Sequence, residues 1–282
     1  MNTGTAYQIV DSQIHIWGTD TPLRPWPYKI RAHRETPFSA VEALREMDVA
    51  GVQRAVLVPP WWEGERNDLA AEAARNHPDR FGVMGLLAAD APDAPQRLAK
   101  WRTTPGMLGI RFSSQHPKYR TAFADGSVEW VWGAAEKSEI PIMMSVHPAE
   151  LPLVQRVARR YSGLRLAIDH MGRDIGKLDS AAFPCMPQLL ELARLPNVAV
   201  KASGLPAYTS ESYPFPLMQS YAREVFEAFG PRRFFWGSDL TKLPCTYRQA
   251  VTLFTEAIDW IPAEDTPWVM GRGLSEWLRW SG

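Results

Sequence analysis

The sequence predicts an α/β protein with the (β/α)8 TIM-type barrel fold, formed as a single domain over residues 1–282. Short apolar runs rich in β-branched residues alternate with longer segments of helical pattern, which is typical of a parallel sheet with its connecting helices. Eight such runs occur, and a helical segment follows each of them. The length of 282 residues is close to the roughly 250 that this barrel takes.

The first half of the chain begins with a strand, and a loop rich in Pro and Trp separates it from the first helix. Ser39 and Glu42 have the spacing of a helix-capping box, and Gly51 stands where a helix-ending glycine is expected, so a helix is predicted between them. The turn Pro105-Gly106 precedes the fourth strand. The predicted strands are 7–15, 54–58, 81–87 and 107–112, and the two further helices are 67–76 and 94–101.

The second half repeats the scheme, with predicted strands at 141–146, 164–169, 198–202 and 233–236. Its predicted helices are 128–137, 151–161, 189–195, 215–229, 247–260 and 274–280. An open, doubly wound sheet would fit this alternation almost as well. The barrel is favoured because no Gly-x-Gly-x-x-Gly or Walker loop follows any predicted strand.

Composition excludes several classes of function. The formal net charge is zero, so there is no electrostatic case for binding nucleic acid or an anionic membrane surface. No apolar run approaches a membrane span, and the first residues lack the pattern of a signal peptide. The two cysteines are too few for a disulfide scaffold. We therefore expect a cytoplasmic protein whose partner is a small molecule, and the sequence leaves a homo-oligomer open.

Polar residues gather where the predicted strands end, and the active sites of such barrels lie at the carboxyl ends of the strands. Three of the six histidines are found there. The remaining ones, His33, His77 and His116, fall in loops or at a helix end and are expected to be solvated or to pack loops. The candidates at strand ends are Asp11, Gln13, His15, Arg111, His147, Asp169, His170, Lys201, Ser203, Ser238 and Asp239.

Each candidate has a purely structural alternative. Asp11, Gln13 and His15 alternate along one strand, so all three are expected to face the barrel interior, where Asp11 could also bond loop backbone with His15 as its partner. Asp239 follows four apolar or small residues and a serine, and it could cap the next segment instead. Arg111 suits bidentate binding of a carboxylate, but it could equally pair with a carboxylate of the site itself.

Lys201 and two aromatic residues are further candidates for substrate binding. Lys201 could bind an anion, or it could pair with Asp169 or Asp239. Trp61 and Tyr208 could form an aromatic rim for a planar substrate, or they could pack the long loops onto the barrel. Those loops, 18–38, 59–66, 113–126 and 204–216, are expected to determine specificity.

Five segments together resemble the amidohydrolase-related family of the amidohydrolase superfamily over nearly the whole chain, in particular its 2-pyrone-4,6-dicarboxylate lactonase-like hydrolases. They are Val-Asp-Ser-Gln-Ile-His-Ile-Trp (10–17), Leu-Gly-Ile-Arg-Phe (108–112), Ile-Asp-His-Met-Gly-Arg (168–173), Val-Lys-Ala-Ser-Gly (200–204) and Phe-Trp-Gly-Ser-Asp (235–239). The resemblance implies a barrel in which Asp239 is the general base. It also implies that His15 and His170 polarise a carbonyl or hold a metal, and that Arg111 grips a substrate carboxylate.

The chain departs from the family pattern at Gln13, where the family has the first histidine of a His-x-His pair. Glutamine is a poor zinc ligand, so a binuclear centre is not expected. A single Zn²⁺ or other divalent metal would be held by His15, His147 and Asp239, and catalysis without a metal is favoured. A second departure is Gly271-Arg272-Gly273, where relatives carry an Asn-Ala pair.

The function that the resemblance and these residues together imply is hydrolysis of a small carboxylated lactone or ester from the catabolism of aromatic compounds. Asp239 would activate water, His15, His170 and Gln13 would stabilise the oxyanion, and Arg111 with Lys201 would anchor the carboxylate. One alternative is a metal-dependent decarboxylase of an aromatic acid, against which Gln13 counts. The other is a non-catalytic barrel kept as a binding protein.

Overall fold

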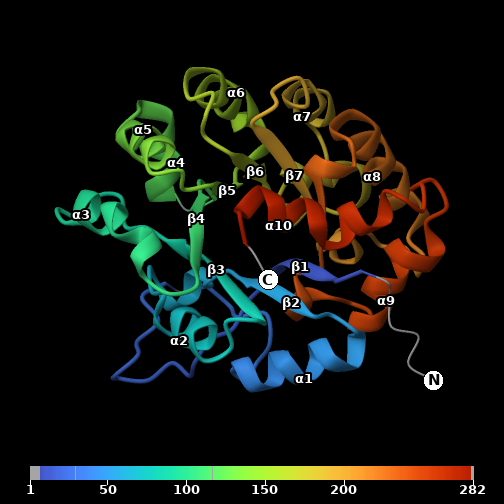
Figure 1. The fold of residues 1–282 in the computed structure, drawn as a ribbon, viewed down its shortest axis with the longest axis horizontal. Coiled ribbons are helices and arrows are strands. Elements are labelled where there is room, and N and C mark those ends of the chain that lie inside the picture. Colours follow the sequence, from blue (N-terminus) through green and yellow to red (C-terminus); the bar gives the residue numbers. More distant parts are fainter. Residues whose placement is uncertain (1–6, 29, 116, 281–282) are drawn as a thin grey trace.

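The chain folds as a nearly closed barrel of eight parallel strands, which lie side by side in chain order with helices outside them (Figure 1). The computed structural model describes residues 7–28, 30–115 and 117–280. The strands are β1 (Val10–Ile14), β2 (Arg54–Leu57), β3 (Phe81–Leu86), β4 (Met107–Ser113), β5 (Ile142–Ser145), β6 (Leu166–Ile168), β7 (Val198–Ser203) and β8 (Phe234–Gly237). The predicted single-domain (β/α)8 fold is confirmed.

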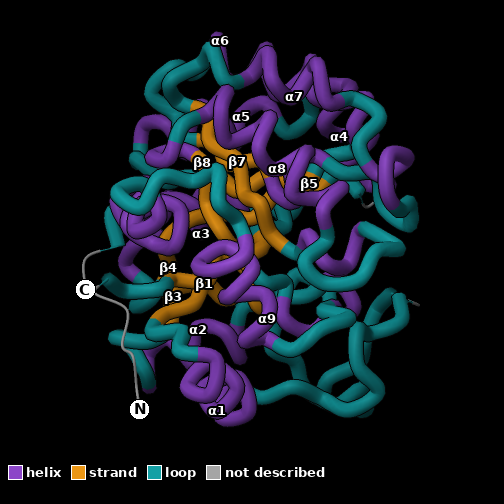
Figure 2. The backbone as a smooth tube through the Cα atoms, turned by 90° about the vertical axis from the view of Figure 1, so that its right-hand side faces the viewer, coloured by secondary structure: helices purple, strands orange, loops and turns teal. Residues whose placement is uncertain are grey.

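The helices form a layer around the strands, which are enclosed at the centre of the molecule (Figure 2). They are α1 (Ala40–Ala50), α2 (Asp68–Asn76), α3 (Ala94–Ala99), α4 (Pro117–Asp125), α5 (Glu129–Lys137), α6 (Leu151–Arg160), α7 (Met186–Leu192), α8 (Pro216–Phe229), α9 (Tyr247–Thr252) and α10 (Gly273–Leu278). None of the helices in the described residues is long and apolar enough to cross a membrane.

Most predicted helices are present, and the differences have local causes. The Ser39 side chain accepts from the Glu42 backbone and the Glu42 carboxylate accepts from the Ser39 backbone, so the predicted capping box opens α1. Helix α4 lies in a segment that was expected to be a loop. The helix buries only Tyr119 and Phe123, and this short apolar stripe is the reason that the sequence did not indicate a helix. Helix α9 ends early and continues as a π-helical segment, Leu253–Ala257.

The barrel interior has an apolar end and a polar end. At the apolar end, one buried side chain from each strand packs against α10 and the residues after it. These side chains are Val10, Val56, Met84, Leu108, Met143, Ala167, Ala199 and Phe235. Because this end is filled, the polar side chains of the strands gather at the other end, where the strands reach their carboxyl termini.

A bulge in β1 changes which residues face inward. Asp11 pairs with Ala55 and Ile14 with Leu57, so three steps along β1 match two along β2. Val10 therefore faces the interior, whereas Asp11 points outward and accepts hydrogen bonds from the Gln13 and Ser238 backbones and from the Tyr247 hydroxyl. The expectation that Asp11 shares the inward face with Gln13 and His15 is wrong. Its carboxylate instead satisfies buried donors at the junction of β1 and β8.

Candidate active site

A pocket of about 320 Å³ opens at the carboxyl ends of the strands. The charged residues in its lining are Arg111, Arg173 and Lys242, all of them cations. The complete lining is Gln13, His15, Ile30, His33, Pro60, Trp61, Trp62, Arg111, Ser113, Gln115, Pro117, Ser145, His170, Arg173, Ile175 and Lys242. Of the sequence candidates, Gln13, His15, Trp61, Arg111 and His170 are therefore brought together.

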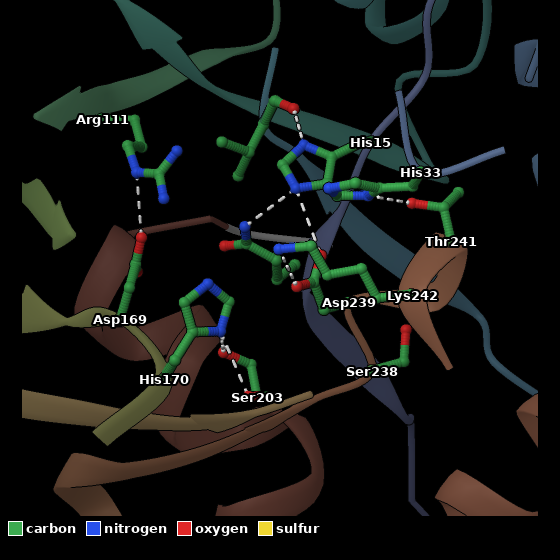
Figure 3. Close-up of polar contacts among 12 residues, drawn as sticks. His15, His33, Arg111, Asp169, His170, Ser203, Ser238, Asp239, Thr241 and Lys242 are labelled. Carbon is green, nitrogen blue, oxygen red and sulfur yellow. Dashed lines mark hydrogen bonds and ion pairs between the residues drawn. The ribbon is translucent and has the colours of Figure 1, made fainter. Parts of the chain in front are cut away.

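Asp239 lies beside this pocket, fully buried, two residues after the end of β8 (Figure 3). Its backbone has a φ of 50°, a left-handed conformation that is rare for a residue with a side chain. The carboxylate Oδ1 is 3.2 Å from His15 Nε2, and Oδ2 is 3.3 Å from Lys242 Nζ. Burial raises the pKa of Asp239, but the nearby positive charges, above all Lys242, outweigh burial and hold the pKa well below its ordinary value. Asp239 is therefore ionised at neutral pH.

Two of the three histidines that line the pocket, His15 and His170, donate Nδ1–H to backbone carbonyls. Nδ1 of His15 is 2.6 Å from the Val58 carbonyl oxygen, and Nδ1 of His170 is 3.1 Å from the Ser203 carbonyl oxygen. A carbonyl can only accept, so each Nδ1 carries a proton, and the lone pair of a neutral ring is then on Nε2. Burial holds the pKa of His170 well below its ordinary value, which keeps that ring neutral.

The orientation of Gln13 follows from its neighbours. Lys201 Nζ donates a hydrogen bond to Gln13 Oε1, so the amide nitrogen is turned toward His15. The distance from Gln13 Nε2 to His15 Nε2 is 3.2 Å, and the amide N–H donates to the lone pair there. Gln13 therefore presents N–H groups, and not its carbonyl, on the side of His15.

Lys201 and Arg111 share a buried carboxylate, Asp169. Lys201 Nζ lies 2.9 Å from one oxygen of Asp169, and Arg111 Nε lies 3.0 Å from the other. Burial raises the pKa of Asp169, but the two cations outweigh it and lower the pKa to about 2. Both structural alternatives named for these cations are thus realised. Arg111 still reaches the pocket, whereas Lys201 is fully buried and contacts Gln13 from within the barrel.

Sequence reasoning missed two cations of the pocket. Arg173 is 7% exposed, and no carboxylate among the described residues lies within ion-pair distance of it. Its guanidinium stacks over the Tyr208 ring at 4.4 Å, so Tyr208 supports Arg173 and is not part of the pocket lining. Arg173 ends the segment 168–173, and Lys242 follows Asp239 by three residues, so both lay beside motifs already singled out.

His147 is not placed with His15 and Asp239. Its side chain is 37% exposed, and its Nε2 lies 3.9 Å from Asp174. The histidine that joins them is His33, from the loop between β1 and α1, which was expected to be solvated or to pack a loop. One ligand atom from each of His15, His33 and Asp239 lies within 4.8 Å of the others. No sequence pattern marked His33, because its position depends on how the loop folds over the barrel.

His77, one of the other two histidines expected to be solvated or to pack loops, lies outside this group. His77 packs edge-on against Phe81, and His116 lies outside the described residues.

The donor set of this group fits a divalent metal ion. Burial lowers the pKa of His33 to about 2, so it is neutral, while Asp239 is ionised. Both carboxylate oxygens of Asp239 are buried, and neither receives a hydrogen bond of good geometry from the described residues. Two imidazoles, one carboxylate and a remaining open position are what a catalytic zinc site uses.

Comparison with known proteins gives consistent results. An L-fucono-1,5-lactonase from Burkholderia ambifaria is 29% identical over 234 residues, which is 82% of this chain and 79% of that protein. An amidohydrolase structure from Burkholderia multivorans with bound zinc superimposes with a TM-score of 0.80 at 22% identity, over 96% of this chain and 99% of that one. A putative 2-pyrone-4,6-dicarboxylic acid hydrolase from Pseudomonas putida gives 0.74 at 18% identity, over 98% and 99%.

The family model described as Amidohydrolase matches residues 10–271. This match takes in all eight strands and every residue of the candidate site. The chain therefore belongs to the amidohydrolase family.

Proposed function

We propose that this protein hydrolyses a small carboxylated lactone, with Asp239 as the general base that activates water. One observation carries the proposal: an ionised, buried carboxylate lies beside a pocket whose charged lining residues are all cations. A carboxylate that is ionised and free of hydrogen bonds can accept a proton from water. The cations provide a counter-charge for an anionic substrate and for the charge that develops during attack.

The chemical class of the substrate follows from the lining and from the relatives. Two of the similar proteins bear names of lactone hydrolases, one for a sugar lactone and one for a pyrone dicarboxylate. Trp61, Trp62 and Ile30 give the pocket apolar walls, which suit a flat ring better than a polyol. Arg173, Arg111 and Lys242 suit carboxylate groups on that ring.

The proposed reaction begins when water attacks the lactone carbonyl and Asp239 takes its proton. The oxyanion that forms is stabilised by the Gln13 amide N–H and by the cations of the pocket. The ring C–O bond then breaks, and the leaving oxygen takes the proton back from Asp239. The products are a hydroxyl group and a carboxylic acid on one open chain, and the acid ionises to a carboxylate by releasing its proton to solvent.

The histidine tautomers refine the expected roles of His15 and His170. In this tautomer His170 offers a lone pair on Nε2, so we assign it to orient the attacking water or a substrate hydroxyl as an acceptor. The lone pair of His15 already accepts from Gln13, so we assign His15 to hold the Gln13 amide in position. Oxyanion stabilisation then falls to Gln13 and the cations. A divalent ion held by His15, His33 and Asp239 would supply Lewis acidity at the same place, while the steps above use only groups of the chain.

The test is an assay of the purified protein against pyrone carboxylates, muconolactones and the neutral L-fucono-1,5-lactone. Hydrolysis of a lactone releases one proton per turnover, whereas decarboxylation releases CO₂ and takes up a proton. We expect proton release on a carboxylated lactone. CO₂ release from an aromatic acid, or turnover of the neutral lactone alone, would show that the proposed reaction or substrate class is wrong.

A further inference from the structure

We propose that the substrate carries an apolar substituent, which leaves the pocket between Ile30, Pro117 and Ile175 while a carboxylate of the same molecule lies among the cations inside. The inference rests on the proposed function and narrows its substrate class to carboxylated lactones with an alkyl or aryl group. It is carried by the distribution of exposure along the pocket. Among the described residues of the lining, the exposed ones are these three, and all of them are apolar.

The mouth of the pocket differs in chemistry from its interior. Arg111 and Arg173 are each 7% exposed, whereas Ile30 is 41% exposed and Ile175 is 51% exposed. Single exposed apolar side chains are common on proteins, but exposed apolar side chains gathered around one opening mark a surface that binds. Because the charges lie inside and the apolar side chains outside, a ligand that contacts both has a charged end and an apolar end.

The three apolar residues come from different sides of the barrel. Ile30 lies in the loop between β1 and α1, Pro117 is the first residue of α4, which follows β4, and Ile175 lies in the loop between β6 and α7. The strands β1, β4 and β6 are spaced around the barrel, so side chains from three directions border one opening. A group that passes through this opening therefore meets apolar surface on several sides.

Backbone hydrogen bonds hold the two isoleucines at the mouth. The Ile30 amide donates to the Tyr28 carbonyl oxygen at 2.8 Å. On the other side, the Asp174 amide, next to Ile175, donates to the Ala182 carbonyl oxygen at 2.8 Å. Because the backbone of each segment is already held, covering these side chains with a ligand costs little further ordering of the chain.

The wall between the interior and the mouth suits a flat ring, since Trp61 and Trp62 line it. A ring whose carboxylate reaches the buried cations directs the substituent on its opposite side toward the mouth. The 4-alkylbenzoates reproduce this arrangement, because they place a carboxylate and an apolar chain at opposite ends of a planar ring. They contain no lactone, so they bind without being hydrolysed.

The experiment measures the binding of benzoate, 4-ethylbenzoate and 4-butylbenzoate to the full chain by isothermal titration calorimetry. Burial of one CH₂ group strengthens binding by up to about fourfold. We therefore expect 4-butylbenzoate, which has two more of these groups, to bind roughly 4- to 16-fold more tightly than 4-ethylbenzoate. The heat-capacity change of binding should become more negative as the chain lengthens, because apolar surface leaves water.

Variants of the mouth test where the alkyl chain lies. Ile30→Ser and Ile175→Ser should each bring the ratio of the butyl and ethyl affinities closer to one, and should leave the affinity for benzoate within about twofold. Val49→Ser is the matched control, because it removes an exposed apolar side chain of α1 outside this lining, and it should keep the wild-type ratio. Arg173→Gln should weaken all three ligands by a similar factor, since each has the same carboxylate.

Equal affinity for the three ligands would overturn the inference. It would also be overturned by a ratio that Ile30→Ser and Ile175→Ser leave unchanged, or by failure of all three ligands to bind. Because binding is measured without turnover, these outcomes are distinguished from failure of the proposed hydrolysis. An alkyl effect in a protein that opens no lactone would refute the hydrolysis alone, and hydrolysis without an alkyl effect would refute the apolar substituent alone.

Discussion

His15 Nε2 and Asp239 Oδ1 lie 3.2 Å apart across the junction of the first and last strands of the barrel. The proton of His15 is on the other ring nitrogen, bound to the Val58 carbonyl. A lone pair and a carboxylate oxygen therefore face each other without a proton between them. This arrangement is stable only when a donor or a cation lies nearby, which Gln13 and Lys242 provide here. It leaves Asp239 ready to accept a proton or to bind an ion.

Asp239→Asn tests the general base. The amide cannot accept a proton from water, so we expect kcat on a lactone that the parent hydrolyses to fall by about 100- to 10,000-fold. Asp174→Asn, which changes a carboxylate near His147 outside the pocket lining, serves as the control. Wild-type turnover by Asp239→Asn would refute the assignment.

Arg173→Gln tests the recognition of a carboxylate. A hydrogen bond to a charged group contributes about 1.5–3 kcal/mol, so we expect kcat/KM on a carboxylated lactone to fall by roughly 10- to 100-fold, mainly through KM. The same change should leave turnover of a neutral lactone nearly unaffected. Arg160→Gln, on the exposed surface, controls for loss of a positive charge. An equal loss on charged and neutral substrates would contradict the role of Arg173.

Lys201→Met tests the buried network that orients Gln13. The substitution leaves Asp169 paired with Arg111 alone, so we expect the free energy of unfolding in urea to fall by about 3 kcal/mol. Asp169→Asn combined with Lys201→Met should recover part of this loss, because no buried carboxylate is then left without its partner. A double variant that is less stable by the sum of both single losses would show that the pair is not coupled.

The same network predicts a dependence of stability on acid. The folded pKa of Asp169, about 2, is below its unfolded value, so its contribution is present above roughly pH 4 and is lost as the pH falls toward 2. A shift of this size corresponds to about 2 kcal/mol. Melting temperatures between pH 5 and 2 should fall at a higher pH in Lys201→Met than in the wild type. Identical melting temperatures of the two proteins across this pH range would show that the Asp169–Lys201 pair is not the origin of the acid dependence.

Removal of metal tests whether the proposed hydrolysis needs an ion. Because Asp239 and the cations of the pocket can carry out each step, we expect chelator-treated protein to keep most of its kcat. The measurement compares kcat of the stripped enzyme before and after Zn²⁺ is added back. A rise in kcat of more than about tenfold would show that an ion is required for the reaction.

The sequence alone was enough to predict most of the fold. Strand and helix periodicity, together with the Ser39 cap and Gly51, placed α1 and all eight strands to within a few residues. Each helix or strand must bury one face, so its apolar residues recur at a regular spacing that can be recognised from the local sequence. The predicted first strand was wrong in one respect, the inward direction of Asp11. The bulge and the hydrogen bonds of Asp11 with the Ser238 backbone and with Tyr247 of α9 depend on residues distant in sequence.

For the site, the sequence alone identified the residues attached to strand ends, Gln13, His15, Arg111, His170 and Asp239. A strand end in a barrel has a known destination, so its position along the chain also gives its position in space. Only the tertiary structure showed that His33 replaces His147 beside Asp239, and that Arg173 is the pocket cation without a carboxylate partner within ion-pair distance among the described residues. These residues lie on loops, where contacts distant in sequence, such as that of His33 with Thr241, determine which way a side chain points.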